Sequence, residues 1–106
     1  MTGSELIAAE RTRQKEVERW TEMHDDNEHY FGGLWKAAVC YVQNSPDGIT
    51  VGGFPPWRPP CEWPWESQWW KPSDDRIRNL VKAGALLAAE IDRLQRAALA
   101  AGKVGK

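Results

Sequence analysis

The most regular pattern of apolar and polar positions lies in the last third of the chain. Apolar residues recur there at intervals of three and four, which is the spacing of one face of an α-helix. The series runs through Ile77, Leu80, Val81, Gly84, Leu87, Ala88, Ile91, Leu94 and Ala98. Ser73 and Asp74 precede it as capping residues, so the pattern predicts a helix over 74–101 and a flexible tail over 102–106. The stripe is longer than one short helix can cover, which favours a homodimer or a higher homo-oligomer, and Gly84 within it predicts a close approach of another helix.

A weaker helical pattern opens the chain. Ser4 is a suitable capping residue for a helix over 4–20, and the acidic Glu5 beside it suits the positive end of the helix dipole. The apolar positions of this helix form a thin, interrupted stripe, and charged residues such as Glu10 and Arg11 are expected to form a solvated face. A helix of this kind needs a partner to be stable.

A third helix is predicted between these two, over 26–43. It follows a run of good capping residues, and its apolar positions return every three or four residues. Gly32 and Gly33 weaken its first turns, and Cys40, inside the apolar series, is interpreted as a core residue rather than a nucleophile. The β-branched run at 49–51 is at most one short edge strand.

Residues 54–72 form a segment rich in tryptophan and proline. It holds five of the seven tryptophans and six of the seven prolines, and the prolines exclude the interior of a helix or a central strand there. Five indole rings can bury on the order of 1,000 Å², too much to leave in solvent. They either pack as core on Leu80, Leu87 and Ile91 or leave some faces open in a pocket for a flat ligand. We therefore expect a single, mainly α domain over 1–106, with three helices, this long loop packed across them, and at most one very short β element.

Composition and charge narrow the class of protein. The chain has 106 residues and carries 14 Lys and Arg against 15 Asp and Glu, a formal net charge of −1 that disfavours binding to duplex nucleic acid. Its two cysteines, Cys40 and Cys61, are interpreted as free thiols in a reducing cytosol, with no second pair to form a metal knuckle. No stretch approaches the ~18 apolar residues that a membrane span needs. We expect a soluble, cytoplasmic protein without a membrane partner.

The residue types around the Trp/Pro segment are those that bind nucleotides. Indole faces stack on bases, while Lys, Arg and the N-terminus of the helix at 74–101 can hold phosphate. Histidines and carboxylates at 24–29 can bond ribose hydroxyls or amine groups. The predicted ligand-binding residues are Trp57, Arg58, Trp65, Trp69, Trp70, Lys71, Arg76, His24, Asp25, Asp26 and His29. The same tryptophans could instead form a clamped core or a protein-binding patch.

The polar cluster at 24–29 also contains residue types that bind metals. His24 and His29 are five residues apart, whereas a helical metal-binding pair needs a separation of four, so we expect helix capping or ligand contacts and no metal. No Ser or Cys has an evident His partner, and no nucleophile elbow occurs. Neither an enzyme nor a bound cofactor is therefore expected.

Many of these residues belong to one signature. It comprises Glu10, Arg13, Gln14, Trp20, Thr21, His24, Asp25, Asp26, Leu34, Ala37, Ala38, Cys40 and Tyr41, then Trp63, Pro64, Trp65, Trp69, Trp70, Lys71 and Pro72, and finally the run 78–86 with Ala89, Glu90, Ile91, Arg93 and Leu94. In this signature, over about residues 10 to 95, the chain resembles a group of small phage and prophage proteins. Arg19 stands where that group often has glycine. The layout of helices around a Trp/Pro loop also resembles the ryanodine-receptor repeat domain, as an architecture.

The resemblance implies a phage context rather than a chemistry. A small, non-catalytic phage protein with an aromatic cleft is expected to act against host defence in the cytoplasm of an infected bacterial cell. By analogy with phage sponges, it would bind and sequester a nucleotide-derived immune signal of the cyclic ADP-ribose or cyclic dinucleotide type. The alternative is a small protein inhibitor of a host defence complex that acts through its aromatic patch.

Overall fold

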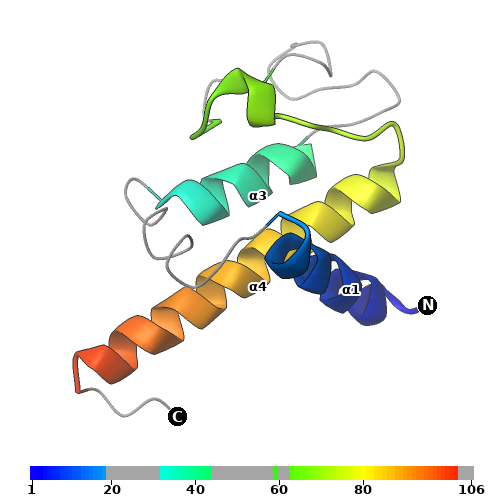
Figure 1. The fold of residues 1–106 in the computed structure, drawn as a ribbon. Helices are drawn as coiled ribbons and strands as arrows, with labels where there is room; N and C mark the ends of the chain where they lie inside the picture. Colours follow the sequence, from blue (N-terminus) through cyan, green and yellow to red (C-terminus); the bar gives the residue numbers. More distant parts are fainter. Residues whose placement is uncertain (19–31, 44–58, 60–62, 103–106) are drawn as a thin grey trace.

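A computed structural model describes residues 1–18, 32–43, 59 and 63–102, which form a mainly α fold (Figure 1). Its helices are α1 (Gly3–Glu16), α3 (Gly33–Gln43) and α4 (Arg76–Ala100), with a short 3-10 turn, η3 (Ser67–Trp69), before α4. No strand occurs in these residues, and the predicted edge strand at 49–51 lies outside them. The prediction of a mainly α fold is confirmed, and the part of the chain that the structure describes contains three α-helices. Within the same residues, no helix combines the length and the apolar character needed to cross a membrane.

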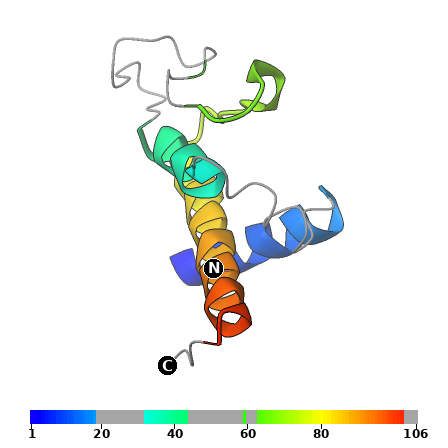
Figure 2. The ribbon, with the colours of Figure 1, turned by 90° about the vertical axis from the view of Figure 1, so that its left-hand side faces the viewer.

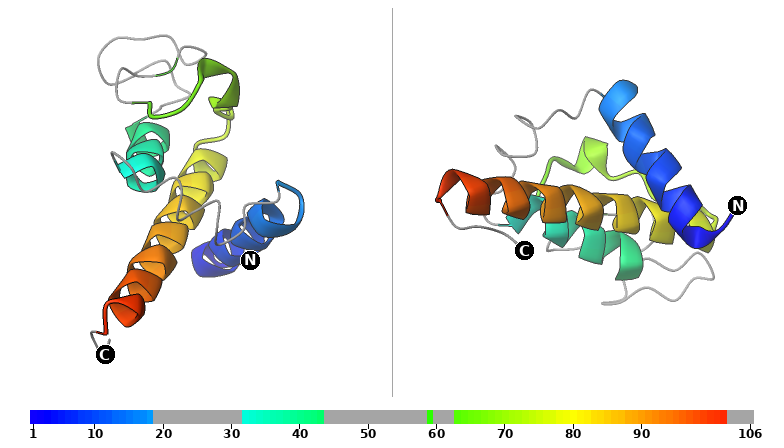
Figure 3. Two further views of the ribbon diagram at one scale, coloured as in Figure 1. Left: turned by 60° about the vertical axis from the view of Figure 1, so that its left-hand side comes forward. Right: turned by 90° about the horizontal axis from the view of Figure 1, so that it is seen from below.

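α4 is the central helix, and α1 and α3 pack on two of its sides (Figures 1 and 2). α3 runs antiparallel to α4, and the main core lies where these two helices meet (Figure 3). Much of this core consists of alanines, whose small side chains let the two helix backbones come close. The buried cluster comprises Leu34, Ala37, Ala38, Cys40, Tyr41, Trp70, Ala83, Leu86 and Ala89. Cys40 is thus a core residue, as predicted.

The first helix begins and ends earlier than the predicted range 4–20. Thr2 caps it, because its hydroxyl accepts a bond from the Glu5 N–H at 3.2 Å while the Glu5 carboxylate accepts one from the Thr2 N–H at 2.7 Å. This reciprocal pair satisfies two backbone donors that would otherwise be free at the helix start. α1 ends at Glu16, just beyond which two successive N–H groups share the Arg13 carbonyl.

The charged face of α1 is buried in part. The prediction of a solvated face was wrong for Glu10 and Arg11, whereas Lys15 and Glu16 are exposed as predicted. Glu10, Arg11 and Gln14 are all buried, because this face packs on α4. Glu10 Oε1 lies 2.7 Å from Arg78 Nη2, and Arg11 Nη2 lies 4.0 Å from Asp92 Oδ2. α1 therefore docks on α4 largely through ion pairs, because its sequence offers few apolar residues for this contact.

The close helix approach predicted at Gly84 is confirmed. A Cβ atom added at this glycine would lie 2.6 Å from Ile7 Cδ1 of α1. That separation is well inside van der Waals contact between carbon atoms. α1 thus crosses α4 at a position where α4 carries no side chain.

The start of each of the other two helices also differs from its predicted range. Gly32 has a φ of +72°, in the left-handed region that glycine adopts readily, and α3 begins only after it. The earlier part of the predicted range, 26–31, lies outside the described residues. α4 is capped by Asp75 rather than by Ser73 or Asp74, because the Asp75 carboxylate accepts a bond from the N–H two residues further on at 2.9 Å.

The tryptophan loop does not pack on the side of α4 that was expected from the sequence to support it. The residues of that side, Leu80, Leu87 and Ile91, are exposed. Trp70 is the buried tryptophan, with its ring centroid 4.8 Å from that of Tyr41 and 4.9 Å from that of Trp63. Trp63 and Trp65 are partly buried against the same core. The loop thus supplies core and also leaves aromatic surface beside it.

Candidate functional site

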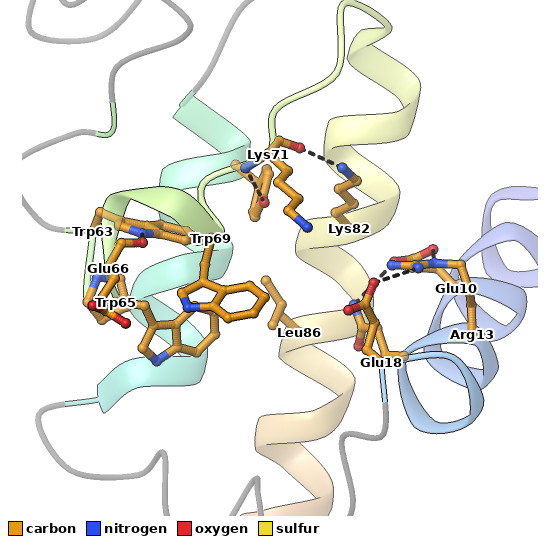
Figure 4. A pocket seen from close by; sticks show the side chains of 13 residues that line it. Glu10, Arg13, Glu18, Trp63, Trp65, Glu66, Trp69, Lys71, Lys82 and Leu86 are labelled. Carbon is orange, nitrogen blue, oxygen red and sulfur yellow. Dashed lines mark hydrogen bonds and ion pairs between the residues drawn. The ribbon is translucent and has the colours of Figure 1, made fainter.

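The segment before α4 encloses a pocket together with α1, α3 and the middle of α4 (Figure 4). The cavity has a volume of about 590 Å³, within the range of small-molecule sites, ~300–1,000 Å³. An aromatic wall lies on one side, polar side chains of α1 lie on the other, and Leu86 of α4 lies between them. The lining residues are Glu10, Arg13, Gln14, Glu18, Tyr41, Trp63, Pro64, Trp65, Glu66, Trp69, Lys71, Lys82 and Leu86.

Three tryptophans, Trp63, Trp65 and Trp69, form the aromatic wall. The indole N–H of Trp63 donates to the Glu66 carbonyl at 3.1 Å, which holds this ring across the turn that leads into η3. The rings of Trp63 and Trp65 are nearly perpendicular, with an interplanar angle of 83° and centroids 5.3 Å apart. Trp69 lies in η3 and is 49% exposed. Much of its indole surface is therefore open to a stacking partner.

Two lysines lie at the end of the pocket between its walls. The Lys82 ammonium donates to the Lys71 carbonyl at 2.6 Å, and Lys71 Nζ lies 5.4 Å from the centroid of the Trp69 ring. The Lys71 N–H donates to the Tyr41 hydroxyl at 3.2 Å, which fastens this segment to α3. The pKa of Lys82 is lowered, mainly because burial disfavours its charged form and to a smaller extent because the positive charge of Arg78 lies nearby. An anion in the pocket would favour the charged form of this lysine.

The α1 wall is built around a buried carboxylate. Glu10 accepts bonds from Arg13 Nε and Nη2, both at 2.9 Å, and forms the 2.7 Å contact with Arg78. Burial acts to raise the pKa of Glu10, but the hydrogen bonds and charges of the two guanidinium groups outweigh it, so the pKa is lowered. Arg13 also donates to Glu18 at 2.9 Å. These ion pairs hold the polar wall in place.

Gln14 provides an unused hydrogen-bond acceptor in the same wall. Its side chain is buried, and its Nε2 lies 3.4 Å from Glu10 Oε2 as a donor. Its Oε1 has no hydrogen-bond partner among the described residues. A buried carbonyl oxygen without a partner costs ~1–3 kcal/mol. A ligand N–H or O–H group reaching Gln14 would remove that cost.

The pocket therefore offers three kinds of contact within one cavity. Its aromatic wall can stack on a flat ring, its two ammonium groups can attract an anion, and its α1 wall can accept bonds from hydroxyl or amine groups. Its lining, as far as the structure describes it, contains no His, Cys or Ser that could serve as a nucleophile or its base. This combination is suited to binding by stacking and charge.

The structure separates the predicted site residues into three groups. Trp65, Trp69 and Lys71 line the pocket. Trp70 is only 6% exposed and belongs to the core, because its ring packs between neighbouring aromatic rings. Arg76 begins α4 and does not line the pocket, which lies further along that helix. The remaining predicted residues lie outside the described part of the chain: Trp57, Arg58, His24, Asp25, Asp26 and His29.

Most of the lining residues were not among the predicted ones. Those missed are Glu10, Arg13, Gln14, Glu18, Tyr41, Trp63, Pro64, Glu66, Lys82 and Leu86. Lys82 and Leu86 are four residues apart on α4, so their shared side of the helix was a usable signal. The α1 residues carried no such signal, because only the docking of a polar helix face brings them to the cavity.

The chain was compared with protein families, curated proteins and solved structures. No family model, no curated protein and no solved structure matches it significantly. The resemblance to phage and prophage proteins thus stays a prediction from the signature residues. No group of three or more His, Cys, Asp or Glu side chains within the described ranges is placed to hold a metal ion.

Proposed function

We propose that this chain binds a nucleotide-derived molecule in the pocket and sequesters it without turning it over. The observation that carries the proposal is the position of Lys71 and Lys82 between the tryptophan wall and the polar α1 wall. A nucleotide presents a flat base, an anionic phosphate and hydroxyl donors. The pocket offers a complementary group for each of the three.

In the proposed complex the base stacks on Trp69 or Trp65. Each stacked base contributes roughly 1–3 kcal/mol. The phosphate lies near the ammonium groups of Lys71 and Lys82, where its charge offsets the effect of burial on Lys82. Gln14 Oε1, which has no other partner among the described residues, accepts a bond from an amine or hydroxyl of the ligand.

The signature resemblance supports a phage setting for this binding. The proposed ligand is then a host immune signal of the cyclic ADP-ribose or cyclic dinucleotide type, held in the cytoplasm of an infected bacterial cell. Sequestration of such a signal needs affinity rather than catalysis. The described lining comes from one chain, so the proposed binding does not depend on the homodimer predicted from the sequence.

The rival function is direct inhibition of a host protein through an aromatic patch. That function would favour a convex display of tryptophans. Instead, Trp63, Trp65 and Trp69 line a cavity, and Trp70 is buried in the core. The concave arrangement supports a small ligand over a protein partner.

A thermal-shift screen against cyclic dinucleotides, cyclic ADP-ribose-type molecules and mononucleotides tests the proposal. A ligand at one hundred times its Kd raises the free energy of unfolding by roughly 2.7 kcal/mol, which shifts Tm by roughly 10 °C in a domain of this size. Chromatography should recover that ligand unchanged.

Two substitutions make the screen specific to the pocket. Trp69→Ala should remove most of the thermal shift, whereas Val17→Ala, at an exposed residue outside the pocket, should not change it. A flat response of the wild type across the panel contradicts binding. Recovery of the ligand as a reaction product contradicts sequestration without turnover.

A further inference from the structure

α4 carries a second side that is apolar but open to solvent. Its exposed members are Ile77, Leu80, Leu87, Ile91 and Leu94. Each keeps between 41% and 62% of its surface exposed, although together they form most of the strongest apolar series in the sequence. With Gly84 between the two leucines, the intervals are three and four throughout. This spacing is typical of a helix that packs lengthwise against another helix.

α3 carries a shorter stripe of the same kind. Trp35, Val39 and Val42 keep between 39% and 45% of their surface exposed, and they are spaced by four and three residues. They lie on a different side of α3 from Leu34, Ala38 and Tyr41, which belong to the core.

Helical geometry places the two stripes on one face of the molecule. On α4, the exposed stripe lies roughly 100–130° around the helix from the side that meets α3, at about 100° per residue. α1 crosses α4 within this stripe, where Ile7 lies over Gly84, and the exposed side chains continue on both sides of that crossing. The same rotation per residue, applied to α3, places the α3 stripe on the same side of the molecule as the α4 stripe, because α3 runs antiparallel to α4. We call the eight exposed side chains the α3–α4 face.

The size of the α3–α4 face is that of a protein interface. Its side chains together expose on the order of 700 Å², more than the ~300–600 Å² of the largest apolar patch on a typical monomer. A stable interface of standard size buries about 800 Å² on each partner. The face also includes an exposed tryptophan, Trp35, a residue type enriched at interface centres.

We propose that the α3–α4 face joins two copies of this chain in a two-fold homodimer. The occupant is a second copy because the same two apolar helices, related by a two-fold axis, present ridges of matching spacing and close into a four-helix bundle. A formal net charge of −1 leaves little electrostatic repulsion between copies. On α4 the pocket is lined by Lys82 and Leu86, which lie roughly 150° around the helix from the exposed stripe, so both pockets stay open in the dimer.

Light scattering coupled to size-exclusion chromatography tests the dimer. The wild type should have a mass of about 24 kDa, twice the 12.0 kDa of one chain, and its Tm should rise with protein concentration. Leu87→Glu combined with Ile91→Glu should give a folded monomer, since both side chains are exposed in the single chain. Val39→Glu tests the same face from α3. Leu99→Glu, at an exposed position off the stripe, is the matched control and should remain a dimer.

Four outcomes overturn the proposal. The first is a wild type that is monomeric at all concentrations, which would leave the face to a different partner or to solvent. The second is a dimer that survives both the α4 and the α3 substitutions, and the third is a control variant that dissociates like them. The fourth is a loss of folding in both the α4 and the α3 variants, because side chains that the single chain needs in order to fold are not available as a docking face.

Discussion

Replacement of Glu10 by glutamine should loosen the docking of α1 and disturb one wall of the pocket. Glu10 is buried and bonds two guanidinium groups, of which Arg13 belongs to α1 itself and Arg78 belongs to α4. A hydrogen bond to a charged group contributes roughly 1.5–3 kcal/mol. Both arginines are more than one-third exposed, so water compensates part of the loss. We expect Glu10→Gln to lower the free energy of unfolding by about 2 kcal/mol, out of the roughly 5–15 kcal/mol typical of a small domain.

The pH dependence of this loss identifies its cause. Because the pKa of Glu10 is lowered in the folded protein, its stabilisation should be fully present above the ordinary glutamate pKa of about 4.3. It should be lost as the pH falls through the lower pKa of the folded state, where the wild-type carboxylate takes up a proton. The difference between wild type and Glu10→Gln should therefore be constant near neutral pH and shrink in acid.

Urea denaturation followed by far-UV circular dichroism at several pH values measures this difference. Glu16→Gln is the matched control, because Glu16 is exposed on the same helix; its effect should stay within ~0.5 kcal/mol. Glu10→Gln as stable as the wild type at neutral pH would refute the docking role. A loss of equal size in acid would refute the ionic explanation.

Three further predictions concern the core, the ligand and the helix crossing. Trp70→Ala should lower stability by roughly 3–5 kcal/mol in denaturant titrations because this ring is buried, whereas Trp69→Ala should leave Tm nearly unchanged; equal losses would contradict the division into core and pocket. Affinity for a phosphate ligand, measured by fluorescence titration, should fall as the pH rises through the lowered pKa of Lys82, since a neutral amine no longer attracts phosphate; a Lys82→Met variant that keeps the same dependence would exclude this lysine. Gly84→Ala should destabilise by roughly 1–3 kcal/mol despite its better helix propensity, with partial recovery when Ile7→Val is added; a more stable Gly84→Ala would show that Ile7 yields freely.

The helices were predictable from local patterns, and so was the side on which α3 packs, because its periodic apolar positions Leu34, Ala38 and Tyr41 are buried. The sides that α1 and α4 turn to the core were not predictable in this way. The stripe with Leu80 and Leu87 is the most regular on α4 and predicts a helix correctly. The buried contacts of that helix nevertheless use smaller residues such as Ala83 and Ala89, which permit close backbone packing. Periodicity shows that a helix face is apolar, and it does not distinguish a face turned to the core from one turned to a partner.

The pocket was predictable only on its aromatic side. Composition pointed to Trp65, Trp69 and Lys71, because indoles beside a cation in a proline-rich loop are unusual. Glu10 was predicted to lie on a solvated helix face, since a charged face normally meets water, and Gln14 only interrupted the apolar stripe of this helix. Their burial follows from the pairing with α4, which is a contact between residues far apart in sequence and leaves no local pattern.

An NMR titration of the tryptophan indole N–H signals tests whether a nucleotide ligand binds in the pocket. The chain has seven tryptophans, and single Trp→Phe variants assign their signals. With a cyclic dinucleotide or a cyclic ADP-ribose-type ligand, we expect saturable shifts of the Trp65 and Trp69 signals, little change at the buried Trp70, and a ligand that remains intact. Indole signals that stay unchanged at Trp65 and Trp69 up to millimolar concentrations of every ligand in the panel would contradict the proposed pocket.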